Sequence, residues 1–142
     1  MSPQLPLSLD SSIVSCLLRP GRNPQVVRRY ESSVEEGTRF ILCPLVYYEV
    51  RRGLLKLAAE RQLGRFDGLC RRWQWSDFVP ADWETAAQLW VGLERRGRQI
   101  GDADLLIAVH ALRRQATLVT DNEAHFAGLG VSILNWRTQP AE

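Results

Sequence analysis

The chain has 142 residues, of which 45% are hydrophobic and 24% charged, and its formal net charge is only +2. These values are typical of one soluble globular domain and exclude a strongly basic, histone-like protein. No apolar stretch approaches the ~20 residues that span a bilayer, and the N-terminus lacks a basic region, so neither a membrane span nor a signal peptide is predicted. The three cysteines, Cys16, Cys43 and Cys70, form no C-x-x-C pair and are interpreted as reduced core thiols of a cytoplasmic protein.

The first half of the chain alternates strand and helix patterns. In order, we predict a strand at residues 5–9, a helix that is capped by residues 11–12 and ends at residues 19–21, a helix that opens at residues 23–24, a strand at residues 39–43, and a helix from residue 44 to residue 57. The first strand ends directly at Asp10.

The second half continues the same alternation. In order, we predict a break at Gly64, a helix at residues 65–72, a strand at residues 76–79, a helix capped by Asp82 that runs to about Gly97, a helix at residues 102–114, a strand at residues 117–120, a short helix around residues 124–126 and a strand at residues 131–134. Trp90 and Trp136 are expected in the core, whereas Trp73 and Trp75 fit the core, a dimer interface or a docking surface equally well.

Such alternation predicts an α/β domain over residues 1–142, with a parallel sheet covered by helices on both faces. The functional crevice of such a sheet lies outside the carboxyl ends of its strands. Asp10 follows the first predicted strand, and Asp121 and Asn122 follow the fourth. The fold alone therefore predicts that these three side chains lie at the functional edge.

Two further acids are placed by helical spacing. Glu49 shares a face with apolar residues three and four positions earlier, so its carboxylate is expected either to face the protein or to swing outward to Arg52 at i+3. Asp104 lies in the first turn of an apolar helix, where it could complement the helix dipole. Asp102 is the better cap, which leaves Asp104 facing the protein.

Several carboxylates at one edge cannot all stay ionised without a compensating cation. Oxygen ligands with little histidine suit Mg²⁺ or Mn²⁺ and do not suit zinc. The histidines are His110, expected in the core, and His125, expected as a surface or packing residue. A metal held in this way can orient water and stabilise the charge that builds on a scissile phosphate.

These residues also carry a family pattern. SLDSSIVSCLLR resembles the opening of PIN domains in the VapC-like toxin branch, and CPLVYYEVRRGLLK resembles their second motif. IGDADLLIAVHAL resembles the third motif, IGxxDxxIAAHAL, and LVTDNEAHF with GVSILNW resembles the terminal TxNxxxF and NW. The four motifs occur in the family's order and span nearly the whole chain, so the sequence is similar to PIN-domain ribonucleases.

The resemblance implies a three-layer α/β/α sandwich with a five-stranded parallel sheet, Mg²⁺- or Mn²⁺-dependent ribonuclease activity and frequent homodimers. Asp10, Glu49 and Asp104 match the three main acidic positions, with Asp10 and Asp104 as the principal metal ligands. Asn122 matches the fourth position, and Asp121 stands one place before it. Toxin members also pair with a small antitoxin that blocks the site.

Two small polar residues, Ser12 and Thr120, match positions that help to orient the site, although the family's Asp-Thr-Asn is Asp10-Ser11-Ser12 here. As a hypothesis, Glu49 and Asn122 complete the metal site directly or through water, and a nearby carboxylate accepts the proton of the attacking water. The expected products carry a 5′-phosphate and a 3′-hydroxyl.

Arginine provides every basic residue except Lys56, and its planar fork suits phosphate, although a GC-rich genome would produce the same bias. The candidates for an RNA path are Arg51, Arg52, Arg95, Arg96 and Arg98. A solvated helix face with ion-pair partners explains these arginines equally well.

Other readings of the acids fit less well. A receiver-type signalling domain needs a late lysine, and Lys56 is badly placed; a haloacid-dehalogenase-type phosphatase needs D-x-D after the first strand, where Ser12 stands. Two alternatives stay open: a PIN-fold protein that binds a partner or RNA without cutting, and an RNA-processing nuclease without an antitoxin. The sequence predicts neither the RNA that is cut nor the number of metal ions.

Overall fold

The computed structural model describes residues 4–138 and has one parallel sheet in that part of the chain. Its strands are β1 (Leu7–Leu9), β2 (Phe40–Leu42), β3 (Gln74–Trp75), β4 (Thr117–Val119) and β5 (Ile133–Leu134). The strand order is β3-β2-β1-β4-β5, and every neighbouring pair is parallel. The predicted α/β class and five-stranded parallel sheet are therefore confirmed.

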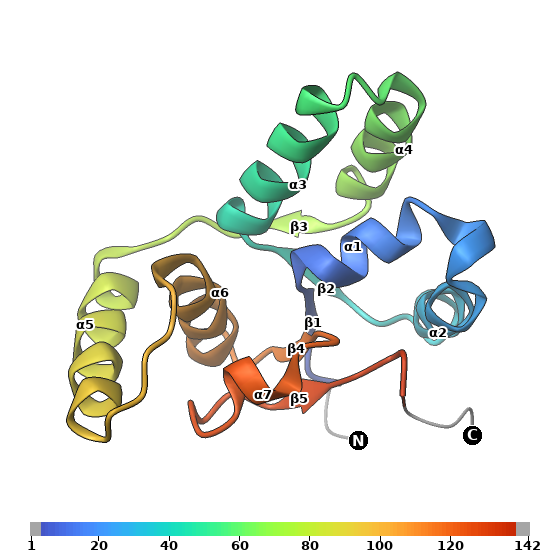
Figure 1. Cartoon of the computed structure of the whole chain (residues 1–142). Helices are drawn as coiled ribbons and strands as arrows, with labels where there is room; N and C mark the ends of the chain where they lie inside the picture. The colour runs from blue at the N-terminus through green and yellow to red at the C-terminus, as the bar shows by residue number, and fades with distance from the viewer. Residues whose placement is uncertain (1–3, 139–142) are drawn as a thin grey trace.

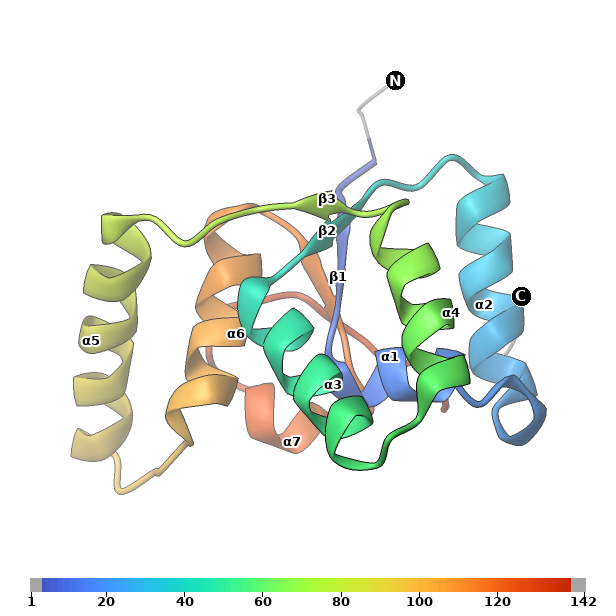
Figure 2. The same cartoon turned by 90° about the horizontal axis from the view of Figure 1, so that it is seen from above.

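Helices cover both faces of this sheet. The helices are α1 (Ser11–Leu17), α2 (Pro24–Glu35), α3 (Pro44–Lys56), α4 (Glu60–Cys70), α5 (Pro80–Arg95), α6 (Asp102–Arg113) and α7 (Glu123–Phe126), and a short 3-10 turn, η1 (Pro20–Arg22), links α1 to α2. Figures 1 and 2 show α1 to α4 on one side of the sheet and α5 to α7 on the other, with α5 outermost. This arrangement is the predicted three-layer α/β/α sandwich.

The strand order reverses between β1 and β4. Leu7 in β1 pairs with β2 on one side and with Thr117 of β4 on the other. Beyond the last paired residues, the Asp10 amide still donates to the Val119 carbonyl at 2.9 Å. Because ligands of doubly wound sheets bind where the strand order reverses, the chain after β1 and β4 frames the crevice in which a site is expected.

Two local predictions about element bounds were wrong. The third strand was expected at residues 76–79 but is formed by Gln74 and Trp75. Residues 76–79 are instead held by α6, because its C-cap residue Arg114 donates to the Ser76 hydroxyl at 2.7 Å and to the Asp77 carbonyl at 2.7 Å. Gly64 lies inside α4, which begins at Glu60, and marks no break.

The buried side chains form one core around the sheet. Trp136 is 2% exposed, as predicted, and Trp73 is also buried, where its indole donates to the Tyr30 hydroxyl at 3.1 Å. The core prediction for Trp90 was wrong, since this residue of α5 is 45% exposed. Figure 1 shows α5 as the outermost helix on its side of the sheet. Within residues 4–138, no helix is long and apolar enough to cross a membrane.

A buried acid ties α5 to the end of α6. Asp82 was predicted to cap α5 but lies in its first turn, where its carboxylate accepts from the Val79 amide at 2.8 Å. The side chain is fully buried and is paired with Arg113 at 2.7 Å and with Arg114 at 2.8 Å. Burial raises the pKa of the Asp82 carboxyl, but the hydrogen bonds from Arg114, Val79 and Arg113 outweigh it and hold this pKa well below its usual range.

The predicted core histidine, His110, completes the same region. It is fully buried on α6, and its Nε2 lies 2.7 Å from the Ser76 carbonyl oxygen. Burial lowers the pKa of this imidazole, so the ring stays neutral near pH 7. The contacts of Asp82 and His110 therefore hold the C-terminal half of α6 in place. Because the helix is rigid, they also determine the position of its N-terminus, which carries Asp104.

Candidate active site

Asp10 is the most enclosed acid at the carboxyl edge of the sheet. It follows β1, forms the N-cap of α1 and is 6% exposed. Its carboxylate accepts from the Ser11 amide at 2.8 Å, the Thr120 hydroxyl at 2.8 Å and the Ser12 hydroxyl at 3.3 Å. Both oxygens are thereby held in one orientation by two residues of α1 and by Thr120, which directly follows β4.

The charge balance around Asp10 is unfavourable. Burial raises the pKa of its carboxyl above the ordinary value, and the negative charge of Asp104 raises it further. The hydrogen bonds from Thr120, Ser11 and Ser12 act in the opposite direction and offset only part of this rise. The fold thus places two carboxylates close enough to repel each other, which is the condition that a bound cation relieves.

Glu49 on α3 turns toward Asp10. Its Oε1 accepts from the Ser11 hydroxyl at 3.0 Å, and the same hydroxyl lies 3.4 Å from Asp10 Oδ1. The alternative pairing with Arg52 is not formed, because the Arg52 guanidinium lies 4.8 Å from the centre of the Tyr48 ring. Ser11 therefore bridges the two carboxylates, a role that the sequence did not reveal.

Asp104 reaches the site from the first turn of α6. Its side chain is 34% exposed, and Oδ2 lies 3.1 Å from Nδ1 of His125 on α7. Gly101 occupies the N-cap position and Asp102 is an exposed first helical residue, so the expected capping by Asp102 is not observed. His125 was predicted to be a surface or packing residue, and no sequence signal indicated its contact with an acid of the site.

The segment after β4 closes the site. Thr120 is fully buried and, besides donating to Asp10, accepts from the Asn122 amide at 3.0 Å. The Asn122 side chain is exposed, and the Asp121 carboxylate lies 3.7 Å from the Arg137 guanidinium. Thr120 and Asn122 thus stand beside Asp10, whereas Asp121 is turned toward the C-terminal segment.

The donors at this edge fit a hard divalent cation. Asp10, Glu49 and Asp104 supply carboxylate oxygens, and serine and threonine hydroxyls lie between them; Mg²⁺ and Mn²⁺ prefer such oxygen ligands. In the part of the chain that the structure describes, no three acidic, histidine or cysteine side chains are already close enough to enclose an ion. The arrangement therefore suits an ion held by two carboxylates and several waters, as is usual for Mg²⁺.

A groove of about 440 Å³ opens beside these acids, between α1, α3 and the turn to α4. Ser11, Ser12 and Glu49 line its inner end, and Arg52 lines it farther out. Its outer part is apolar, with Leu54 and Leu57 among the lining residues. Of the five arginines predicted to contact RNA, Arg52 is the one that lines this groove.

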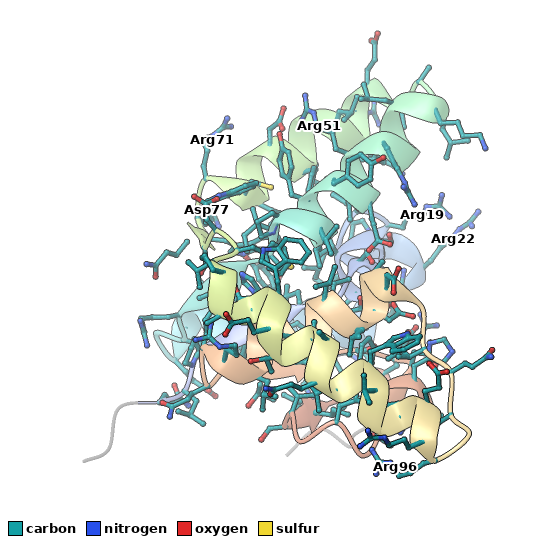
Figure 3. All side chains as sticks on the ribbon, turned by 90° about the vertical axis from the view of Figure 1, so that its left-hand side faces the viewer. Arg19, Arg22, Arg51, Arg71, Asp77 and Arg96 are labelled. Carbon is teal, nitrogen blue, oxygen red and sulfur yellow. The ribbon has the colours of Figure 1, made fainter. Side chains whose placement is uncertain are left out.

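The other four predicted arginines lie elsewhere or are engaged. Arg51 pairs with Asp67 of α4 at 2.9 Å. Arg98 donates to the carbonyls of Ala124 and His125 at 3.1 and 2.8 Å, and also contacts the carbonyl of Ala127, so it fixes the end of α7. Arg95 and Arg96 lie at the end of α5, where Arg96 donates to the Gly92 carbonyl at 3.3 Å; Figure 3 shows Arg96 at the far end of that helix.

The fold and the acidic edge define a known class of protein. The profile of the PIN domain matches residues 7–130, and the chain belongs to this family. One relative, Ribonuclease VapC2 of Rickettsia felis, is 29% identical over 130 residues, which cover 90% of this chain and 96% of the relative.

Solved structures of two complexes are similar over almost the whole chain. VapBC2 of Rickettsia felis, bound to a DNA fragment from its promoter, has a TM-score of 0.83 at 25% identity, covering 93% of this chain and 99% of that one. DNA-bound VapBC of Salmonella typhimurium has a TM-score of 0.78 at 26% identity, covering 94% of this chain and 99% of that one. The predicted resemblance to PIN domains is thereby confirmed.

Proposed function

We propose that this chain is a metal-dependent endoribonuclease and the toxin of a toxin–antitoxin pair, acting on cytoplasmic RNA. The observation that carries the proposal is the buried carboxylate of Asp10, which is held by several donors and lies next to the like charge of Asp104. The resemblance to a relative named as a ribonuclease, and to VapBC complexes, supports the same function. A PIN-fold protein that only binds its partner would not need to maintain this repulsion.

The reaction follows from the positions of the acids. Asp10 and Asp104 would hold Mg²⁺ or Mn²⁺, with Glu49 and Asn122 completing the site directly or through water. The bound ion supplies charge stabilisation at the scissile phosphate and lowers the pKa of a bound water. Glu49, which the Ser11 hydroxyl orients, would accept the proton of the attacking water.

Cleavage of a mixed cellular RNA pool tests the proposed function. Purified, antitoxin-free protein should cut RNA with Mg²⁺ or Mn²⁺ and stop when EDTA is added, and the new ends should be a 5′-phosphate and a 3′-hydroxyl. Products with a 2′,3′-cyclic phosphate would instead indicate attack by the ribose 2′-hydroxyl. If folded protein cuts no RNA with either metal, the binding-protein alternative replaces this proposal.

Metal binding is expected to stabilise the fold in a pH-dependent way. Because the folded-state pKa of Asp10 lies above its unfolded value, ionised Asp10 destabilises the fold at neutral pH, and this cost disappears as pH falls through the folded-state pKa. A hundredfold excess of Mn²⁺ over its Kd should stabilise the protein by about 2.7 kcal/mol and raise Tm by roughly 5–10 °C at about pH 7.5.

The same Mn²⁺ concentration should raise Tm much less at about pH 5, because protons then compete with the ion for Asp10. Differential scanning fluorimetry at both pH values measures this difference. Asp10→Asn should show little Mn²⁺-dependent shift at either pH. An equal shift in Asp10→Asn and in the wild type would place the ion elsewhere.

The antitoxin partner would occupy the groove between α1 and α3. The exposed apolar side chains of Leu55 and Leu57 border or line its outer part, and Glu49 lies at its inner end. An antitoxin segment that covers the apolar wall and extends a basic side chain toward Glu49 would close the site. A short reading frame beside the gene, whose product suppresses RNA cleavage when co-expressed, would identify this partner; a nuclease without an antitoxin would have none.

The outer face of α5 is the surface proposed for homodimerisation. Trp83, Trp90 and Val91 are 52%, 45% and 40% exposed there, and they line a shallow groove of about 620 Å³ with Leu106 of α6. Contiguous apolar patches of this kind usually mark an interface. Trp90→Glu should convert a dimer to a monomer in size-exclusion chromatography with light scattering. Trp75→Glu, at an exposed tryptophan of β3, is the control that should stay dimeric.

A further inference from the structure

A second groove beside the acidic edge shares Ser12, Ser15 and Arg19 with the first groove, but its remaining wall is basic and polar instead of apolar. It has a volume of about 540 Å³ and lies between α1, η1 and the C-terminal segment. We call it the basic groove; its lining residues are Ser12, Ser15, Cys16, Arg19, Arg22, Asn23 and Arg137. Ser12 donates to the carboxylate of Asp10, so the groove begins at the proposed reaction centre.

Two arginines of the basic groove have free guanidinium groups. Within residues 4–138, Arg19 and Arg22 form neither an ion pair nor a side-chain hydrogen bond. Figure 3 shows both extending outward on the same side of the molecule, away from Arg71 and Arg96. These charges are therefore available to a ligand, in contrast to Arg51 and Arg98, which the fold already uses.

A third arginine is held in place at the other wall. Arg137 donates to the Cys16 sulfur at 3.2 Å and to the Asn23 side-chain oxygen at 3.4 Å, and it lies 3.7 Å from the Asp121 carboxylate. Its guanidinium is thus fixed between the acidic edge and the end of α1. The groove therefore has one arginine that the fold positions, Arg137, and two arginines without a side-chain partner in the described part of the chain, Arg19 and Arg22. Several positive charges along one groove match the successive negative charges of a phosphate backbone.

The exposed side of α1 provides an open path between these groups. Ser11, Ser15 and Arg19 follow one another at intervals of four residues, which places them along one side of the helix and its end. Eight residues at helical rise cover about 12 Å. Ser15 is small and exposed, so it leaves this path open and can donate a hydrogen bond to a phosphate oxygen, whereas the Ser11 hydroxyl already donates to Glu49.

We propose that the basic groove binds the phosphate backbone of the RNA strand that enters the acidic site. The inference rests on the proposed nuclease function and assigns Arg19 and Arg22, rather than Arg95 and Arg96, as its phosphate contacts. Arginine forks suit phosphate, and no aromatic ring lines the groove to stack bases. The groove therefore recognises the backbone without reading its sequence, and any choice of RNA is made elsewhere on the protein.

The salt dependence of RNA binding tests this assignment. Binding of a fluorescein-labelled single-stranded RNA is measured by anisotropy in EDTA, between about 50 and 200 mM salt, so that cleavage does not interfere. The double variant Arg19→Ala/Arg22→Ala should flatten the log–log salt slope by about 1.4, or about 0.7 for each lost phosphate contact. Ser15→Glu, which adds an acid one turn before Arg19, should weaken binding in the same direction.

Two matched double variants remove the same charge elsewhere. Arg71→Ala/Arg72→Ala alters exposed arginines at the end of α4, and Arg95→Ala/Arg96→Ala alters the end of α5. Both should keep the wild-type slope, and thermal unfolding should show that all variants are folded. A wild-type slope for Arg19→Ala/Arg22→Ala, or a flattened slope for Arg95→Ala/Arg96→Ala alone, overturns the assignment.

The groove assignment and the proposed nuclease function can fail independently of each other. If wild-type protein cuts RNA with Mn²⁺ but Arg19→Ala/Arg22→Ala retains the wild-type slope and cleavage rate, the groove assignment fails and the nuclease stands. If wild-type protein binds RNA through the basic groove yet cuts none, the nuclease function fails and the groove remains an RNA-binding surface.

Discussion

Replacing Asp104 by asparagine is expected to lower the rate of RNA cleavage by about three orders of magnitude. The variant removes one of the two carboxylates proposed to hold the ion, and the ion's electrostatic stabilisation of the reacting phosphate is worth several kcal/mol. A loss of roughly 4 kcal/mol corresponds to a thousandfold slower reaction. Single-turnover cleavage of a labelled RNA, with Mn²⁺ in excess, measures this effect separately from product release.

The fold of Asp104→Asn should be retained. Asp104 is partly exposed, and an asparagine can keep one hydrogen bond to His125 while relieving the repulsion that acts on Asp10. Asp102→Asn is the matched control, because it makes the same charge change two residues earlier on the exposed side of α6. Equal activity of the two variants would show that Asp104 does not take part in the reaction.

Replacing Asp82 by alanine is expected to cost about 3–5 kcal/mol of unfolding free energy. The change leaves Arg113 and Arg114 without their acid at a fully buried position and removes the acceptor of the Val79 amide. Removing one partner of a buried ion pair is more damaging than replacing both, because it leaves the guanidinium groups of Arg113 and Arg114, which are 32% and 17% exposed, without a carboxylate. Urea unfolding at constant m-value measures the loss.

An exposed ion pair is the control for the effect of burying Asp82. Asp67→Ala breaks the ion pair between Arg51 and Asp67, whose side chains are 35% and 45% exposed, respectively. This change should lower the free energy of unfolding by less than about 1 kcal/mol. A similar loss in both variants would contradict the role assigned to burial.

The pH dependence of the Asp82 contribution follows from its lowered pKa. A group whose folded-state pKa lies below its unfolded value stabilises the protein above the unfolded pKa and loses this contribution only as pH falls through the folded value. The difference in unfolding free energy between wild type and Asp82→Ala should therefore stay constant from about pH 7 down to about pH 5. It should shrink only in stronger acid.

The element types and their order were predictable because they depend on local patterns. The strands β1, β2 and β4 are short, largely buried runs, and a helix follows each of them. Residues 76–79 end in the β-prone pair Phe78 and Val79, yet they form no strand. Their conformation is decided by Arg114 and His110, which lie more than thirty residues away and take the carbonyl groups of Ser76 and Asp77. No local pattern contains that information.

The candidate site was predictable only where the fold itself places a residue. Asp10 and Thr120 follow strand ends, so their meeting at one edge required no more than the topology. For Glu49, spacing left two directions open, and the Ser11 hydroxyl, 38 residues away in sequence, decides between them. The contact of His125 with Asp104 likewise spans 21 residues and has no signal in composition or spacing.

The positions of the free arginines were likewise not predictable from local sequence patterns. Clustering at residues 95–98 suggested a basic path, but Arg98 is used to hold the end of α7, which leaves fewer free charges there. Arg19 was interpreted only as part of a helix ending, and no role was predicted for Arg22. Their exposure beside the acids depends on how α1, η1 and the C-terminal segment pack together, which is a property of the tertiary structure.

The hydrogen bond between Thr120 and Asp10 joins residues 110 positions apart. In the sheet, β1 lies between β2 and β4. During synthesis on the ribosome, β1 therefore emerges long before β4, the strand that completes its environment. Contacts of this separation form late in folding. A chain that is interrupted before β4 carries Asp10, Glu49 and Asp104 but lacks the edge that gathers them, so unfinished copies are expected to be harmless to the cell that makes them.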